Sequence, residues 1–412
     1  MPLSRPAAAH WRDPESGHSL RRLSEGLSIA DFHQACLMPT NRKTPFVAVC
    51  ELGQAGGFMK QIAIFNHKGG VAKTTMTFHL AWMLSMLGKR VMVVDCDPQC
   101  NLTGIFLGDM DTEDYPFESE SPQKPRNIRD AVRPAFESRP YMIEATELYE
   151  SPAQKGLFLL PGHVGLSEYE SQLAVAHELS NTLSALQNIP GALHHAIRKS
   201  ADLFGIDYAL VDMSPSLGAI NQNLFMTSDA FILPMAPDLF SAMALRSLAR
   251  TLPKWAEWGR KASANALLKI ADYPFRPVTP AYLGSTVNNF RKRARGEEQA
   301  KPTQAFQKWF DRLAEARSTD LLVALEASKM LLPTETYAAA NAPTNEFLME
   351  IGSLDGLIAT AQELAKPVFA IDLATDTNFR GNVADTYQIK INDVYQGFKS
   401  GAEKVIALTD MF

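Results

Sequence analysis

The sequence has few cysteines, little net charge and no long apolar run, and each shortage excludes a class of protein. Its four cysteines, Cys36, Cys50, Cys96 and Cys100, have the spacing of neither a metal site nor a secreted disulfide framework. The net charge is -5 at pH 7, so no overall positive field attracts polyanions. No apolar run approaches the ~18 residues of a transmembrane helix. We therefore expect a cytoplasmic protein without membrane insertion, in which any DNA contact is a local basic patch.

What is present is enough apolar sequence for a full core, because 46% of the 412 residues are hydrophobic. Residues 1–58 are at first rich in Pro, Ser and Arg and show no strong period, so we expect a poorly ordered tail. Met59 directly precedes the first apolar run, and a start-site extension would explain the tail equally well. The globular domain is expected to span 59–412.

Beyond Met59, short β-rich runs alternate with longer helical stretches. This alternation is typical of a parallel sheet with helices on both faces, so the sequence predicts a three-layer α/β fold with a twisted, mostly parallel sheet. The strands are expected at 61–66, 90–95, 156–161, 208–212, 230–234, 281–287 and 367–371. An acidic insertion near 108–125 is expected to be a solvated loop. The C-terminal part is expected to be helical, at 303–316, 320–332, 354–364 and 393–408, with weak structure near 334–344.

A glycine-rich turn between the first strand and a helix predicts a phosphate-binding loop. It reads Lys68-Gly69-Gly70-Val71-Ala72-Lys73-Thr74-Thr75. In such a loop the backbone N–H groups and the positive end of the helix point at phosphates, Lys73 adds a mobile charge, and Thr74 offers its hydroxyl to Mg²⁺. Ala72 stands where glycine is usual, and alanine is less favourable wherever φ is positive. A purely structural turn is the alternative, and the strand–loop–helix context argues against it.

Three segments resemble the ParA/MinD group of P-loop ATPases, which carry a deviant Walker A motif, and among them the ParA partition ATPases most. The loop matches that group's KGGVGKTT run except at Ala72. Residues 93–103 are similar to its VDxDPQxNxT segment, and residues 207–218 to its DYxxxDxPPSLG segment, with Ser214 in place of a proline. Weaker matches cover most of the chain after residue 59. The resemblance implies the P-loop NTPase fold and a Mg²⁺-dependent ATPase that binds ATP on the loop.

The resemblance also assigns roles to single residues. Lys68 is similar to the signature lysine, which in the family reaches across a dimer to the other subunit's nucleotide and so makes hydrolysis depend on dimerisation. Asp97 matches the carboxylate that orients the attacking water. Asp95 and Asp212 match carboxylates that support Mg²⁺ or its waters. Asp95 has an alternative reading, because strand ends commonly carry loop-capping aspartates.

Adenine recognition is harder to place in the sequence. Pro237 and Asp238 follow one expected strand, and Asn288 follows another. Ligands gather at the carboxyl edge of an open α/β sheet, so these residues are candidates for contacts with the base. A loop asparagine is more often only a turn former, and this alternative stays open for Asn288.

The only concentrated positive charge in the sequence is Arg291-Lys292-Arg293-Ala294-Arg295. In a ParA-like dimer, two copies of Arg291, Lys292, Arg293 and Arg295 would bind DNA through its phosphates, without sequence preference. The alternative is a solvated loop that Glu297 and Glu298 partly neutralise. The sequence does not decide between them.

Together the motifs predict an ATP-dependent switch for plasmid or chromosome partition. ATP would close a homodimer, the dimer would bind nonspecific DNA and so associate with the nucleoid, and a ParB-like partner would trigger hydrolysis. The runner-up is a MinD-like ATPase of a membrane surface, or one of a secretion or polysaccharide system. That role would need a basic amphipathic C-terminal helix, and residues 406–412 hold no basic residue. The Asp97-Pro98-Gln99 match and the cysteine spacing disfavour a third reading, a metabolic enzyme of the same fold.

Overall fold

The structure is a computed structural model. It describes residues 59–108, 121, 124–179, 183–293, 301–354 and 356–412. The expected tail at 1–58 and most of the acidic insertion lie outside these residues. Within them, no helix combines the length and the apolar character needed to cross a bilayer.

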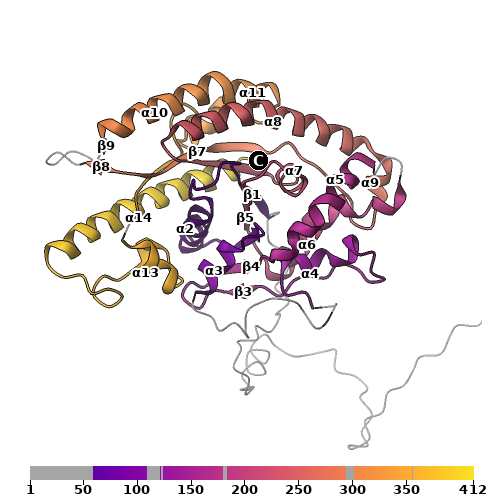
Figure 1. Cartoon of the computed structure of the whole chain (residues 1–412), viewed down its shortest axis with the longest axis horizontal. Helices are drawn as coiled ribbons and strands as arrows, with labels where there is room; N and C mark the ends of the chain where they lie inside the picture. The colour runs from indigo at the N-terminus through magenta and orange to yellow at the C-terminus, as the bar shows by residue number, and fades with distance from the viewer. Residues whose placement is uncertain (1–58, 109–120, 122–123, 180–182, 294–300, 355) are drawn as a thin grey trace, which may run out of the picture. The chain divides into compact units, whose positions relative to one another are not determined.

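An eight-stranded sheet forms the centre, and all of its neighbouring strands are parallel except the pair at one edge (Figure 1). The order across the sheet is β10-β7-β6-β1-β5-β2-β4-β3. The strands are β1 (Lys60–Ile64), β2 (Val91–Cys96), β3 (Tyr149–Glu150), β4 (Leu157–Leu160), β5 (Tyr208–Met213), β6 (Ala230–Met235), β7 (Ala281–Phe290) and β10 (Met349–Gly352). Six of the seven expected strands are therefore confirmed.

The sheet has a separate core on each face, because successive strand residues point to opposite sides. Ile62 and Ile64 of β1 pack on one side, while Ala63 and Phe65 pack on the other. The first side is covered by α2 (Lys73–Met86), α3 (Asn101–Leu107), α12 (Thr334–Ala339) and α14 (Asn382–Thr409). The second is covered by α4 (Ile128–Phe136), α5 (Glu170–Leu179), α6 (Ile189–Phe204), α7 (Ala219–Met226), α8 (Leu239–Ala264), α10 (Gln304–Ala316) and α11 (Leu322–Ala327). The three-layer α/β prediction is confirmed.

The expected closing strand at 367–371 is wrong. Residues Val368–Ala370 form a single 3₁₀ turn, η4, and the backbone N–H of Val368 donates to Nε2 of His79 on α2 at 3.0 Å. Pro367 just before it has no N–H to offer a sheet ladder. The last strand of the sheet is instead β10, which pairs with β7 in parallel.

The C-terminal part is helical, as expected, but its boundaries differ. A π-helical turn, η3 (Arg317–Leu321), joins α10 to α11, and the stretch expected to be weakly structured contains α12. α13 covers only Ile358–Glu363, while α14 begins at Asn382, well before the expected start at residue 393. A small separate core joins α13, η4 and α14.

Candidate functional site

The predicted phosphate loop connects the central strand β1 to α2. Gly70 and Ala72 have positive φ angles, 72° and 63°, so the chain curls in the left-handed region at both residues. A Cβ atom added at Gly69 or Gly70 would meet nothing within 4 Å, which shows that the loop faces open space. Among the residues that the structure describes, no side chain caps the N-terminus of α2, and the first turn of this helix holds no acidic residue. The unpaired N–H groups at this helix end are therefore available to an anion.

Two of the predicted carboxylates lie side by side beneath the loop, because β2 and β5 are neighbouring strands. Asp95 pairs in register with Asp212, and Asp212 with Ile64 at the end of β1. Both side chains are buried. Asp97, also buried, follows β2 directly, and its Oδ1 accepts a hydrogen bond from the backbone N–H of Gln99 at 3.0 Å. The structure thus brings together all three aspartates that the sequence singled out.

The hydrogen bonds of Asp95 and Asp212 differ. Asp95 Oδ2 accepts from both N and Oγ1 of Thr103, at 2.8 and 2.7 Å, which is the pattern of a loop-capping aspartate. Asp212 receives hydrogen bonds from Thr74 and, at 3.5 Å, from Thr77, whereas its Oδ2 has no hydrogen-bond partner within the described residues. Of the two, Asp212 is the carboxylate with an oxygen left for a ligand.

Burial dominates the electrostatics of this site. It raises the pKa of Asp212 to about 8, with a further contribution from the nearby Asp95, and it raises the pKa of Asp95 to about 6 against the hydrogen bonds from Thr103. Lys73 is buried beside them, and burial lowers its pKa against the attraction of Asp212 and Asp97. Its Nζ donates to the backbone oxygen of Lys68 at 3.3 Å. The site therefore holds one ammonium among three carboxyl groups.

Lys68 is held by its own chain. Its Nζ lies 2.5 Å from Oδ2 of Asp238 and 3.3 Å from Oγ of Ser241, at the start of α8. Asp238 also caps α8, because its Oδ1 accepts from the backbone N–H of Ser241 at 2.8 Å. Although burial acts in the opposite direction, the hydrogen bonds from Lys68 and Ser241 hold the pKa of Asp238 below its usual value.

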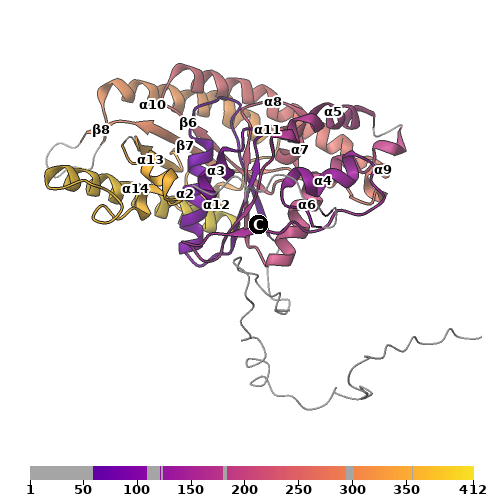
Figure 2. The ribbon, with the colours of Figure 1, turned by 60° about the horizontal axis from the view of Figure 1, so that its bottom comes forward.

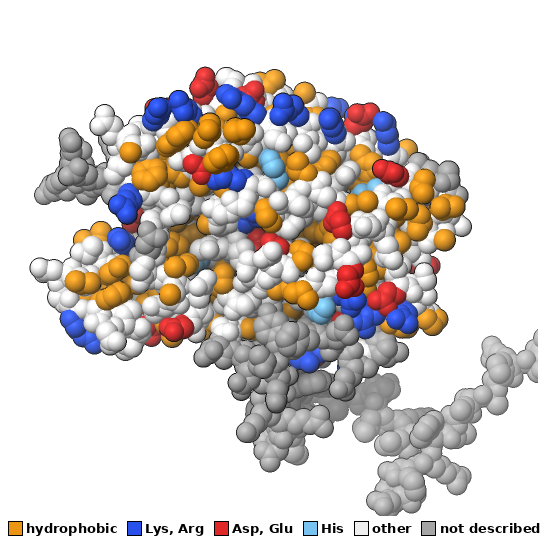
Figure 3. Space-filling view, viewed as in Figure 1, with side chains coloured by type: hydrophobic (Ala, Val, Ile, Leu, Met, Phe, Trp, Pro, Cys, Tyr) orange, Lys and Arg blue, Asp and Glu red, His pale blue; other side chains and the backbone are white. Residues whose placement is uncertain are grey.

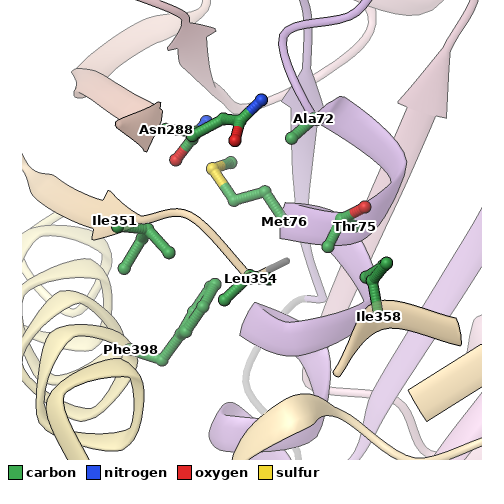
Figure 4. Close-up of a pocket in the computed structure, with 10 residues that line it drawn as sticks. Ala72, Thr75, Met76, Asn288, Ile351, Leu354, Ile358 and Phe398 are labelled. Carbon is green, nitrogen blue, oxygen red and sulfur yellow. The ribbon is translucent and has the colours of Figure 1, made fainter. Parts of the chain in front are cut away.

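A cavity of about 210 Å³ opens beside the loop, at the same edge of the sheet (Figure 4). Met76 extends into it from α2 toward Asn288, and Ile351 and Phe398 line it from β10 and α14. Asn288 is buried, and its Nδ2 donates to the backbone oxygen of Val71 at 3.1 Å. The complete lining is Ala72, Thr75, Met76, Asn288, Asn289, Ile351, Gly352, Leu354, Ile358 and Phe398.

The residues predicted to contact adenine therefore lie at two different places. Asn288 lines the cavity, whereas Asp238, which follows the buried Pro237, contacts Lys68. Sequence reasoning missed Met76 and Phe398. Met76 had a usable signal, since it lies one helical turn beyond Ala72. Phe398 had none, because it comes from a helix more than 300 residues farther along the chain.

The basic segment at 291–295 contains the strand β8 (Lys292–Arg293). This strand pairs antiparallel with β9 (Lys301–Pro302), and we call the two strands the basic hairpin. Arg291 is exposed, and its backbone oxygen accepts from the N–H of Thr303, the residue before α10. Arg295 lies outside the described residues. The hairpin therefore stands beside the N-terminus of α10, apart from the nucleotide loop (Figure 1).

Comparisons with known proteins agree with the motifs. A family model described as an AAA domain matches residues 59–263. The sporulation initiation inhibitor protein Soj of Bacillus subtilis is 28% identical over 194 residues, which are 47% of this chain and 64% of Soj. The chromosome partitioning protein ParA of Caulobacter vibrioides is 28% identical over 197 residues, 48% of this chain and 63% of that protein.

The chain thus spans less than two thirds of the length of both partition proteins. A solved structure, an ATP complex of a variant of Cyanothece McdA, is similar with a TM-score of 0.49 and 19% identity, over 85% of this chain and 97% of that one. The matched family region contains the phosphate loop, all three aspartates and Lys68.

Proposed function

Because the chain belongs to the ParA family of P-loop ATPases, we propose that it is an ATP-dependent switch for plasmid or chromosome partition. ATP closes a homodimer, the dimer binds DNA without sequence preference, and a ParB-like partner stimulates hydrolysis. The observation that carries the proposal is the arrangement at the loop, where Lys73 and three buried carboxyl groups lie beneath an open, uncapped helix end.

The residues of the loop fit a nucleoside triphosphate. The backbone from Gly69 to Thr75 and the N-terminus of α2 cradle the phosphates, and Lys73 turns its ammonium toward them. Phosphate oxygens then offset the positive charge that the buried carboxyl groups now surround. The adenine base occupies the cavity, where Met76 and Phe398 provide apolar contacts and Asn288 provides a polar group at one end.

The residues also fit a magnesium ion that arrives with the nucleotide. Within the described part of the chain, no group of three or more His, Cys, Asp and Glu side chains could hold a metal ion without other ligands. Mg²⁺ commonly uses one or two protein oxygens together with substrate phosphates and water, and when bound it neutralises charge on the phosphates. Thr74 would supply a hydroxyl to the ion, and Oδ2 of Asp212, which has no hydrogen-bond partner within the described residues, would accept hydrogen bonds from the ion's water, with Asp95 beside it.

Hydrolysis needs a positioned water and charge stabilisation. Asp97 lies at the carboxyl edge of the sheet, next to the loop, and we assign it the role of orienting the attacking water. Lys68 supplies positive charge to the nucleotide of the second protomer, and for this it must leave Asp238. The dependence of hydrolysis on dimerisation thus follows from the conformation of one side chain.

The proposal is tested with two substitutions and one control. We expect Lys73→Ala to abolish ATP binding in calorimetry, because it removes the ammonium that faces the phosphates. We expect Asp97→Ala to bind ATP, to lose hydrolysis and to elute as a dimer with ATP on size exclusion. Lys89→Ala, just beyond the other end of α2, is the matched control and should behave like the parent. Hydrolysis at the parental rate by Asp97→Ala would refute the assignment of the catalytic water position.

A further inference from the structure

The outer face of α8 carries a row of positive charge that the local sequence does not reveal. Five of the six charged residues of this helix are basic, and all six are exposed. They are Arg246, Arg250, Lys254, Glu257, Arg260 and Lys261, and we call the five basic ones the α8 ridge. At 100° per residue they fall within an arc of roughly 120°, so they share one side of the helix.

The ridge is positioned by the core beneath it. The opposite side of α8 buries Leu245, Leu248, Leu252 and Trp255 against the sheet, which turns the basic side outward. Figure 3 shows Lys and Arg side chains along the upper rim, over α8 and its neighbours, with only a few acidic groups between them. From Arg246 to Lys261 the ridge extends ~22 Å along the helix axis, at 1.5 Å per residue.

Ion pairs within the chain do not account for the ridge. Arg246 lies 3.3 Å from Asp320, and Lys261 lies 2.8 Å from Glu257. Within the described residues, Arg250, Lys254 and Arg260 have no carboxylate at ion-pair distance. Like charges four residues apart, as at Arg246, Arg250 and Lys254, destabilise a helix by about 0.2–0.5 kcal/mol per pair. A polyanion bound along the helix would remove this repulsion.

We propose that double-stranded DNA lies along the α8 ridge, as a second contact surface in addition to the basic hairpin. The chain carries a net charge of -5, so the α8 ridge is a local positive surface on a protein that is negatively charged as a whole. Duplex DNA presents one phosphate per ~3.4 Å of each strand, so the ridge spans about six phosphates of one strand. This inference rests on the proposed DNA binding but assigns it to different residues.

The surface between Arg246 and Lys261 favours duplex DNA over two other polyanions. A helix that binds a bilayer exposes large apolar side chains between its cations, whereas the exposed large apolar side chains of α8, those of Leu239, Phe240 and Met243, all precede Arg246. A surface for single strands usually offers exposed aromatic rings for stacking, whereas Trp255 is buried and Trp258 is half-buried.

The ridge and the hairpin lie along one side of the structure. In Figures 1 and 2, β8, α10 and α8 follow one another along the same edge. β9 leads into α10 after a single residue, and α10 packs against α8. A duplex that contacts the hairpin can therefore continue over α10 to the ridge without leaving this side.

The test compares three triple variants of the full chain, with ATP and Mg²⁺, by fluorescence anisotropy on a labelled duplex of mixed sequence. The ridge variant is Arg250→Ala, Lys254→Ala and Arg260→Ala. The hairpin variant is Arg291→Ala, Arg293→Ala and Arg295→Ala. The control is Lys124→Ala, Lys155→Ala and Lys390→Ala, which removes the same charge from exposed positions elsewhere. Circular dichroism and ATP hydrolysis without DNA show whether each variant is folded, and both should match the parent for the ridge variant.

Each phosphate contact contributes about 0.9 to the slope of log K against log salt. We therefore expect the ridge variant to lower this slope by about 3 relative to the parent and the control to leave it unchanged. A ridge variant that binds like the control, while the hairpin variant loses binding, overturns the ridge and leaves the proposed function intact. No binding of the parent to the duplex overturns both. A ridge variant that loses binding only to vesicles containing phosphatidylglycerol also overturns the ridge, in favour of a membrane surface.

Discussion

Ala72 offers a direct measurement of backbone strain in the phosphate loop. It is an alanine at φ 63° and ψ 36°, the left-handed region, at the residue before α2. For an L-residue other than glycine this conformation costs roughly 1–2 kcal/mol. Glycine adopts it without that cost, but it also makes the unfolded chain more flexible, which lowers the free energy of unfolding by about 0.4–1 kcal/mol. Ala72→Gly should therefore stabilise the nucleotide-free protein by about 0.5–1 kcal/mol.

The same loop provides the opposite change and a control. Gly70 has φ 72°, and Gly69 lies outside the left-handed region, while an added Cβ meets nothing within 4 Å at either residue. Gly70→Ala should therefore destabilise by about 0.5–1 kcal/mol, because the strain in the folded loop exceeds the gain from a less flexible unfolded chain. Gly69→Ala should stabilise by about 0.4–1 kcal/mol, because only the effect on the unfolded chain remains.

Urea denaturation of the three variants and the parent, without nucleotide, measures these differences as shifts of the midpoint at constant slope. The signs matter more than the sizes. A destabilised Ala72→Gly together with a stabilised Gly70→Ala would refute the reasoning, since it would show that neither residue bears left-handed strain.

Two further predictions concern side chains that connect distant segments. Asp238→Ala should lower the free energy of unfolding by about 1 kcal/mol, because α8 loses its N-cap, whereas Asp238→Ser keeps a capping oxygen and should cost less in the same urea titration. Burial lowers the pKa of His79 to about 4, so the unfolded chain binds a proton at a higher pH than the folded one. Stability should therefore be lost as pH falls from about 6.5 to about 4, by up to ~3 kcal/mol. His79→Gln should flatten this dependence in unfolding curves recorded across that range, and an unchanged pH dependence would exclude His79 as its source.

The sequence predicted the nucleotide loop and its carboxyl groups because both depend on short segments. Strand, turn and helix are contiguous from Lys60 to Met86, and two parallel strands that end in aspartate bring Asp95 and Asp212 to one edge. Local pattern and parallel-sheet geometry are enough for that inference. The six central strands followed from the same reasoning.

The cavity beside the phosphate loop could not be predicted, because its far wall is built by tertiary contacts. β10 has only four residues, and it lies between helical segments whose pattern hides it. Residues 367–371 have a comparable apolar content but follow Ala365, which has a positive φ of 48°, and they give a backbone hydrogen bond to His79 instead of to a strand. The α8 ridge could not be predicted either, because its basic residues are separated in the sequence and become neighbours only on the surface of the helix.

Lys68 shows how structure changes the meaning of a motif. The motif assigns the residue to a partner's nucleotide, but in this conformation it contacts Asp238 of its own chain. The pair is partly exposed, with 17% of the Lys68 side chain and 41% of the Asp238 side chain accessible. Ion pairs of this kind contribute only about 0–1 kcal/mol, so little free energy holds Lys68 in place. A triphosphate in a dry interface offers a stronger attraction. In the proposed dimer, the contact with Asp238 would therefore keep the lysine beside its own α8 in the free protomer and would be weak enough to break when a second protomer docks.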